Sequence, residues 1–437
     1  MDSAHPITVA LTVLAGLAVL TVRRDLAIAP IILAICFMPM SERVSIGQYD
    51  LPMLRILATF AVVRVVMRGE FRGLRFLRVD GLLLGFTFVS IAAFTFRVGT
   101  TEALVNRLGW AIDGLAIYAF SRCSLRTERD VLRLIEVAVG CCVVTAALMF
   151  VEWTTGRNLF SVFGGVEEYS LVRAGRVRAQ GAFSHPILAG LFGAAWFPIF
   201  VSLWYLGQQR MALVGSLSAF AIIGFSSSST PVAGLLIGIA GLCIWRIRSW
   251  VPLLCYSALP ALALLHILRD KPVWHLLSRI KLIGGSTGWH RYHLIDQAID
   301  HFDEWWLLGT SDTRSWGPYL QDITNEYLLA GIRGGFLSMA LLLALVWAGF
   351  RCVGRAARCQ TSPKAQRFFA WAVGSTFLVH AVSFISVSYF GQLRAVWFLH
   401  LALAATQFEW IQRKHSPQVV PALVRPPLMA AHRLAES

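Results

Sequence analysis

Three arginines lie close together in a chain that is otherwise strongly apolar. Arg173, Arg176 and Arg178 fall within six residues, in a polar segment that precedes an apolar run. A guanidinium offers a planar fork of N–H donors that matches phosphate oxygens, so this spacing predicts a site for a phosphate or diphosphate group. For Arg173 and Arg176, a solvated loop face paired with Glu167 and Glu168 is an equally open interpretation.

A second polar segment, residues 269–327, combines histidines with acidic and tryptophan side chains. Within it, "YHLIDQAIDHFDEWW" has apolar residues at helical spacing, which predicts an amphipathic helix. His293 and His301 lie on roughly one face of that helix. A zinc site needs at least three ligands at suitable spacing, and no HExxH-type motif is present, so we expect no metal.

The tryptophans of this segment, Trp305, Trp306 and Trp316, have two interpretations. Tryptophan just outside a membrane span commonly marks the level of the lipid headgroups. The alternative is stacking against a sugar ring, which gains weight if the segment folds back over the membrane as a lid.

The elements that must position these residues follow from the composition. The chain of 437 residues is 57% hydrophobic and 14% charged, with a mean hydropathy of +0.63, so lipid must be the solvent for most of it. Apolar runs of roughly 15 to 23 residues recur along its length, close to the ~20 residues that a helix needs to cross a bilayer. We predict an all-α polytopic membrane protein with about 12–13 transmembrane helices and a large, partly helical periplasmic loop. The lower count applies if one of the two short runs, 26–40 or 108–120, is not a span. The runs are 7–22, 26–40, 53–67, 81–96, 108–120, 131–151, 187–205, 211–225, 231–245, 250–268, 328–350, 368–390 and 393–410.

Lys and Arg concentrate in alternate connections between these runs. By the positive-inside rule this bias orients the chain, and it accounts for the net charge of +15 without a nucleic-acid partner. It also leaves two long connections outside the cytoplasm. The predicted organisation is ten transmembrane helices in 1–268, including a first periplasmic loop at 152–186, a large periplasmic loop at 269–327, C-terminal transmembrane helices at 328–410 and a cytoplasmic tail at 411–437.

Motifs in both loops resemble one known family. "RAQGAFSHP" is similar to the "RxxGxFxxPN" signature of the O-antigen ligase and Wzy-type O-antigen and exopolysaccharide polymerase superfamily. In the second loop, "STGWHRYHLIDQAI" resembles the "TGRxxxW" region of that family and "WWLLGTSDTRSWG" its "PLxGxGxGxxG" region. "TNEYLLAGIRGG" occupies the place of the "HNxYLxxxxxxG" motif. The resemblance covers residues 178–335 in motifs and the whole chain in hydropathy.

The resemblance implies a glycosyltransferase of the bacterial inner membrane that uses neither a metal nor a cofactor. Its donor would be an oligosaccharide on undecaprenyl diphosphate, and its acceptor another glycan at the periplasmic face. We expect a polysaccharide polymerase that works beside a flippase and a chain-length regulator. The alternatives are an O-antigen ligase that transfers the glycan to lipid A core, a non-catalytic component of the assembly system, and a lipid-linked oligosaccharide transporter. Ionisable residues within spans, such as Arg64, Asp113 and Glu136, keep the transporter open.

The family's arginines imply which residues would hold the diphosphate. Carried onto this chain they are Arg178 and Arg291, with Arg279 as a further ligand, and the arginine cluster adds Arg176. Fixed guanidiniums stabilise the negative charge that builds on a departing diphosphate.

The general base is the point at which the chain departs from the family motif. Thr324 stands where the family has histidine, and threonine cannot act as a base at neutral pH. Asn325 matches the motif and is counted with the catalytic candidates. Our hypothesis is that Glu326 or His293 accepts the proton of the attacking hydroxyl.

Overall fold

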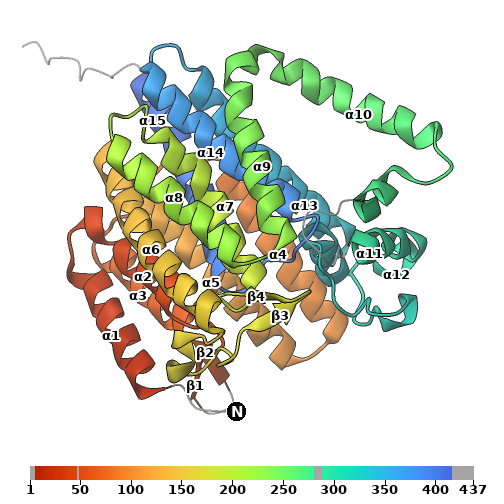
Figure 1. Cartoon of the computed structure of the whole chain (residues 1–437), viewed down its shortest axis with the longest axis horizontal. Coiled ribbons are helices and arrows are strands. Elements are labelled where there is room, and N and C mark those ends of the chain that lie inside the picture. The colour runs from red at the N-terminus through yellow and green to blue at the C-terminus, as the bar shows by residue number, and fades with distance from the viewer. Residues whose placement is uncertain (1–4, 47–48, 280–287, 416–437) are drawn as a thin grey trace, which may run out of the picture.

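The computed structural model of the protein describes residues 5–46, 49–279 and 288–415. It is a bundle of helices with two small β-hairpins at one end (Figure 1). Most of the predicted cytoplasmic tail, and Ser286 and Thr287 of the second loop, lie outside the described residues.

Each predicted apolar run falls on a helix of its own. These helices are α1 (Pro6–Thr21), α2 (Ala29–Phe37), α3 (Met53–Met67), α4 (Arg78–Val98), α5 (Thr101–Ser124), α6 (Glu128–Thr155), α7 (Pro186–Ser202), α8 (Gln209–Phe225), α9 (Ser229–Cys243), α10 (Val251–Ile267), α13 (Glu326–Arg358), α14 (Lys364–Ser383) and α15 (Gly391–His415). Short 3-10 helices η1 (Arg24–Leu26), η2 (Leu159–Phe163) and η3 (Ile244–Trp250) lie in the connections.

Four helical segments are long and apolar enough to cross a membrane. They are Arg78–Val98, Glu128–Thr155, Ser229–Ile267, which joins α9 to α10, and Glu326–Arg358. Shorter apolar helices occupy Pro6–Thr21, Pro186–Ser202 and Gln209–Phe225. The predicted fold is therefore confirmed in its coarse form, as a helical protein in which four of the described segments could span a membrane.

Two predicted runs differ from their helices in length. The run at 26–40 forms only the nine-residue helix α2, because Pro30 starts it and the chain becomes extended from Met38. The run at 108–120 forms the 24-residue helix α5. The charged residues of this helix interrupt its apolar pattern, so the predicted run is shorter than the helix. One of them, Asp113, is accommodated by an ion pair with Arg55 of α3 at 2.8 Å.

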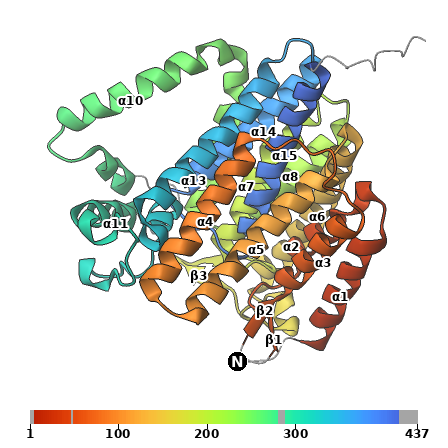
Figure 2. The same cartoon turned by 180° about the vertical axis from the view of Figure 1, so that it is seen from behind.

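The hairpins were not predicted. Strands β1 (Arg43–Ile46) and β2 (Tyr49–Pro52) are antiparallel, and so are β3 (Leu171–Arg173) and β4 (Arg176–Arg178). Both hairpins lie at the same end of the bundle, which we call the hairpin end, and the α4–α5 connection lies there too (Figure 2).

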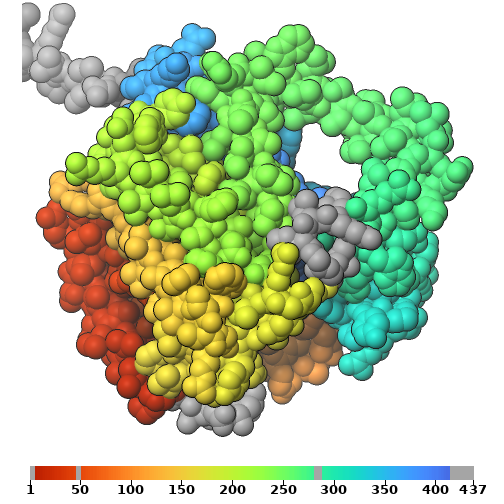
Figure 3. Space-filling view, viewed as in Figure 1, coloured from red at the N-terminus to blue at the C-terminus, as the bar shows by residue number. Residues whose placement is uncertain are grey.

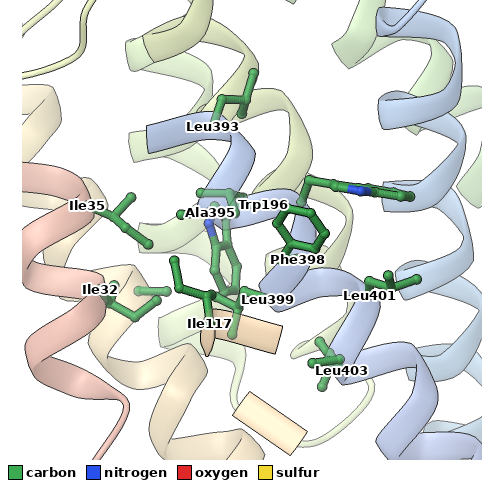
Figure 4. Packing of buried hydrophobic residues seen from close by; sticks show 14 of the residues in the cluster. Ile32, Ile35, Ile117, Trp196, Leu393, Ala395, Phe398, Leu399, Leu401 and Leu403 are labelled. Atoms are coloured by element: carbon green, nitrogen blue, oxygen red, sulfur yellow. The ribbon is translucent and has the colours of Figure 1, made fainter. Parts of the chain in front are cut away.

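The centre of the bundle is α7, which is buried almost all round. Its Trp196 packs among side chains of α2, α5 and α15 (Figure 4). Glycines of α7 let α8 and α9 approach this helix closely. A Cβ on Gly193 would lie 2.7 Å from the Ala219 carbonyl oxygen of α8, and one on Gly190 would lie 2.5 Å from the Pro231 ring of α9. This packing fixes the turn between α8 and α9 at the hairpin end.

The segment between α10 and α13 folds as a small helical unit. It contains η4 (Val273–Arg279), α11 (Gly288–Asp300), α12 (Phe302–Trp305) and η5 (Arg314–Trp316). The amphipathic helix predicted over "YHLIDQAIDHFDEWW" is confirmed as α11 and α12. None of the residues of α10, which leads into this unit, is buried, and an opening separates α10 from the bundle (Figure 3).

A kink in α13 fastens this unit to the bundle. At Gly335 the backbone is left-handed, with φ of 76°, which breaks the helical hydrogen-bond ladder. The freed Ile332 carbonyl accepts from the Thr310 N–H at 2.8 Å, and the freed Phe336 N–H donates to the Trp306 carbonyl at 2.7 Å.

Candidate anion-binding site

The β3–β4 hairpin sets the direction of the predicted arginine cluster. Ala174 and Gly175 both have positive φ, 50° and 71°, which gives the tight turn that suits a right-twisted hairpin. Arg173 pairs with Arg176, and Leu171 with Arg178. Because side chains alternate along a strand and partners share a face, the three arginines lie on one face of the hairpin.

Arg178 is the buried member of the three, with 7% of its surface exposed. Its Nη2 donates to Ser228 Oγ at 2.8 Å. Glu152, at the end of α6, holds the base of the hairpin, because its carboxylate accepts from the N–H groups of Gln180 and Gly181 at 3.0 and 2.7 Å. The guanidinium is thereby held against the turn between α8 and α9.

Arg291 reaches the same turn from α11. Its Nη2 donates to Thr230 Oγ1 at 2.9 Å, two residues after the partner of Arg178. Its Nε is buried and has no partner among the residues described. Two arginines from distant segments, which we call the arginine pair, therefore meet at one run of hydroxyl side chains, the hydroxyl turn of residues 226–230.

The arginine pair carries positive charge without an acid beside it. Within the described ranges, no carboxylate forms an ion pair with Arg178, Arg291 or Arg173. Burial, with the nearby charge of Arg173, lowers the pKa of both Arg178 and Arg291. Cations placed together without counterions are unfavourable, so the site is suited to an anionic ligand that would neutralise them.

Helix α9 adds to this potential. It starts in the hydroxyl turn, and no side chain caps its N-terminus. The positive end of the helix dipole and the first backbone N–H groups therefore face the same region as the two guanidiniums. The site thus combines Arg side chains, hydroxyl groups and a helix N-terminus, which are the groups that bind phosphate in proteins.

Of the other predicted diphosphate ligands, Arg176 lies exposed on the hairpin, and Arg279 lies exposed at the end of η4. The charge of Arg279 acts on the side chain of His275. No hydrogen bond or ion pair in the described part of the chain joins Arg279 to Arg178 or Arg291, although η4 packs against α11. Arg173 and Arg176 are exposed, as the solvated-face interpretation expects, but among the described residues neither forms an ion pair with Glu167 or Glu168, and Glu168 pairs with Arg157 at 3.2 Å.

In the described part of the chain, no hydrogen bond or ion pair joins the predicted catalytic residues to the arginine pair. His293 follows Arg291 by two residues and so points to another side of α11, where it stacks on Trp289 at 4.7 Å. Asn325 is the N-cap of α13: its Oδ1 accepts from the Leu328 N–H at 3.0 Å. The Glu326 carboxylate accepts from the Tyr389 N–H at 2.6 Å.

The tryptophans mainly build the core of the small helical unit. Trp305 and Trp316 are buried beside Leu294 and Ala298, and the Trp305 indole donates to the Ala298 carbonyl at 2.7 Å. Only Trp306 of the three is half-exposed. For Trp305 and Trp316 both interpretations, headgroup belt and sugar platform, are therefore wrong, and their packing is what holds α11 in place.

The histidines of α11 and His301, which follows this helix, do not form a cluster. His301 stacks on Trp316 at 5.2 Å, and its Nδ1 lies 2.9 Å from the Gln297 carbonyl. Across the described residues, no three His, Cys, Asp or Glu side chains come together as a metal site would require.

Sequence reasoning missed the hydroxyl turn and Glu152. The turn has a signal, five consecutive hydroxyl residues between two apolar helices, but it indicates only a polar connection until the arginines are placed on it. Glu152 is a lone acid at the end of an apolar run and has no signal of its own.

His185 should make the stability of the folded protein depend on pH. Its Nδ1 accepts from the Ile187 N–H at 3.1 Å and so caps α7, and burial with the charge of Arg178 lowers its pKa from 6.5 to about 4. As the pH falls, the unfolded chain takes up this proton first, so the contribution to stability is complete above pH 6.5 and is lost towards pH 4. We expect a loss of at most about 3 kcal/mol over that window.

The matched variant is His185→Asn, since asparagine caps a helix without titrating. Thermal unfolding at pH 7 and pH 4.5 should show a smaller acid-induced fall in Tm for the variant than for the wild type. Equal falls in the two proteins would contradict this role of His185.

No protein-family model matches this chain, and no curated protein matches it.

Proposed function

We propose that this protein is a polysaccharide polymerase, a membrane glycosyltransferase that joins oligosaccharide units carried on undecaprenyl diphosphate. The observation that carries the proposal is the meeting of Arg178 and Arg291 at the hydroxyl turn without an acid beside them. The resemblance named the same two arginines from separate loops, and their common partner turn supports reading them as one diphosphate site.

The chemistry of the arginine pair suits a diphosphate leaving group. A guanidinium has five N–H donors. Among the described residues, the guanidiniums of Arg178 and Arg291 each make one hydrogen bond, to a serine or threonine hydroxyl, so the other donors remain for a ligand. The hydroxyls keep the forks in place before the ligand arrives. Cleavage of the bond to the anomeric carbon moves an electron pair onto the diphosphate, and preorganised cations stabilise that charge without a metal.

The proposal includes a topology of twelve or thirteen spans in the bacterial inner membrane, with the hairpin end towards the periplasm. The Arg-rich connections, such as the one between α13 and α14, lie at the opposite end of the bundle, which fits the positive-inside rule (Figure 1). The small helical unit of residues 269–325 would then be the core of the large periplasmic loop.

We keep Glu326 and His293 as candidates for the general base. Glu326 is the better placed for an acceptor, because it starts α13 at the hairpin end and the charges of Arg333 and Arg394 act on its carboxylate. A general base must come within hydrogen-bond reach of the attacking hydroxyl, directly or through one water.

The transporter alternative is weakened by the partners of the charges that suggested it. In a transporter, charged groups that do not form ion pairs with one another would line a pathway near the middle of the membrane. Here they form ion pairs that need no ligand. The pairs are Arg64–Glu70, Asp113–Arg55 and Glu136–Arg133.

A deletion strain tests the proposal directly. If the chain is the polymerase, its loss should leave single oligosaccharide units on the carrier lipid at the periplasmic face, and the wild-type gene should restore long polymer on gels of surface and secreted polysaccharide. Long chains that stay unattached would indicate the ligase, and units confined to the cytoplasmic leaflet would indicate the transporter. Normal polymer in the deletion strain would refute all three.

A further inference from the structure

A second group of arginines meets at the hairpin end, one from each of four helices. Arg97 of α4 and Arg107 of α5 both approach the ring of Phe94, with Cζ at 5.1 and 3.8 Å from its centroid. Arg107 and Arg394 of α15 both approach the ring of Trp110, at 6.0 and 4.2 Å. Three guanidiniums are therefore linked through two aromatic rings.

Arg333 of α13 completes the four-arginine cluster. It lines a cavity of about 290 Å³ together with Arg97 and Phe94. Arg97 Nη1 donates at 2.9 Å to the Ile332 carbonyl that the α13 kink frees. The kink thus brings α4 and α13 together at the position where their arginines meet.

Glu326 attracts Arg333 and Arg394, and Asp113 attracts Arg394, but these acids neutralise the cluster only in part. In the part of the chain that the structure describes, none of the four arginines has an ion pair. Asp113 is held by Arg55 through two hydrogen bonds of 2.8 and 2.9 Å, and Glu326 is held by the Tyr389 N–H. Asp322 lines the 290 Å³ cavity but is exposed to solvent, where a charge is well screened.

Burial makes this arrangement unfavourable for the protein alone. Arg107 is only 7% exposed, and the Nε atoms of Arg97 and Arg107 are buried. Among the described residues these Nε atoms have no hydrogen-bond partner, and neither Arg107 nor Arg333 donates a hydrogen bond from its side chain. The aromatic rings recover part of the lost hydration of the cations, but mutual repulsion among the four remains. An anion with several acceptor oxygens would satisfy both the charge and the free donors.

We propose that Arg97, Arg107, Arg333 and Arg394 form a second anion-binding site, which takes the phosphate or diphosphate group of a second ligand. Phosphate oxygens match the guanidinium forks, and the aromatic stacking keeps those forks planar and oriented. A larger cavity of about 750 Å³, lined by Arg394 and by the Arg55–Asp113 pair, adjoins the cluster. This volume suits a ligand with a sugar as well as its phosphate.

The position of the cluster identifies the ligand as the acceptor's carrier diphosphate, an identification that rests on the proposed function. The carboxylate of Glu326, the candidate base, is acted on by Arg333 and Arg394 of this cluster and not by the arginine pair. A polymerase must hold two carrier-linked glycans at once, and the chain then has one cationic site for each.

The test measures binding to purified full-length protein in lipid nanodiscs. The probes are undecaprenyl diphosphate and inorganic pyrophosphate. The wild type should bind two equivalents of the lipid, Arg333→Gln should weaken one of them at least tenfold, and the double variant Arg178→Ala with Arg291→Ala should lose the other. Tighter binding of the lipid than of pyrophosphate at the Arg333-dependent site assigns it to a lipid headgroup, and equal affinities assign it to a soluble phosphate.

Thermal unfolding separates a binding role from a merely structural one. Among the described residues the Arg333 side chain makes no hydrogen bond or ion pair, so Arg333→Gln should raise the Tm of the ligand-free protein by relieving repulsion between the arginines. The same substitution should reduce the increase in Tm that the probes cause. Arg351→Gln, exposed near the other end of α13, is the control and should change neither.

The two proposals can fail separately. One equivalent bound by the wild type, lost in the Arg178/Arg291 variant and unaffected by Arg333→Gln, overturns the second site and leaves the first. Binding that depends on Arg333 but not on Arg178 and Arg291 overturns the proposed donor site and leaves the second. A lower ligand-free Tm with unchanged affinity in Arg333→Gln makes the cluster structural and overturns the inference.

Discussion

Replacing Arg291 with alanine is expected to lower the rate of glycan polymerisation by about 100-fold or more, the usual effect of removing one preorganised donor from a developing negative charge. Among the described residues, Arg291 donates to Thr230 and forms no ion pair with an acid, so its charge is free to act on the proposed diphosphate ligand. The loss should appear mainly in kcat, because the charge on the leaving group grows as its bond to the sugar breaks.

Two further variants make this result specific. Arg291→Lys keeps the charge but not the planar fork, and should recover only part of the rate. Arg279→Ala is the control, because Arg279 belongs to the same loop but is exposed and, among the described residues, makes no hydrogen bond or ion pair with the site. We expect less than a twofold change for it. Wild-type rates in Arg291→Ala, or an equal loss in Arg279→Ala, would remove the basis for the proposed site.

The largest effect on stability is expected at Gly335. An alanine Cβ there would lie 2.1 Å from the Leu307 carbonyl oxygen, and the backbone φ of 76° is unfavourable for any residue with a Cβ. The oxygen belongs to the backbone and cannot turn aside, so the segment after α12 must move and the bond from Phe336 to Trp306 must lengthen. We expect a loss of about 3 kcal/mol or more in the free energy of unfolding.

Gly85→Ala in α4 is the matched control, since nothing lies within 4 Å of its Cβ position and its backbone is helical. Thermal unfolding of the purified proteins and limited proteolysis of residues 269–325 would be measured side by side. Gly335→Ala should unfold earlier and be cut faster in this segment, while Gly85→Ala should match the wild type. Equal Tm values and equal cleavage would show that the kink does not fasten the unit.

The helices were predictable because long apolar runs have one stable form in lipid. The error at α5 shows the limit of that reasoning. Arg107 precedes the predicted run 108–120 and Arg122 follows it, yet the helix continues because tertiary neighbours receive these charges. Phe94 receives that of Arg107, and Asp80 and Glu409 receive that of Arg122. The hairpins escaped notice because each strand has only three or four residues, too few to show an alternating pattern.

The two cationic sites differ in how far the sequence could predict them. Arg178 belongs to a local cluster and lies in a motif, so its role in an anion site could be inferred. The four-arginine cluster takes one residue from each of four helices, and each arginine alone indicates only a side chain near the end of a span. Asn325 shows what a motif leaves out: its Oδ1 caps α13, and its Nδ2 donates to the Ile385 carbonyl at 3.2 Å, two structural bonds that the motif does not indicate.

The wide spacing of these residues along the chain has a consequence for biosynthesis. The donor site needs Arg178, Ser228 and Arg291, and the second site needs Arg97 and Arg394, which the ribosome delivers almost 300 residues apart. Synthesis and membrane insertion proceed from the N-terminus. A nascent chain therefore completes the first site once Arg291 has been delivered, and the second only when α15 enters the bundle. Under the proposed function, a molecule that still lacks α15 could hold one carrier-linked glycan but not two.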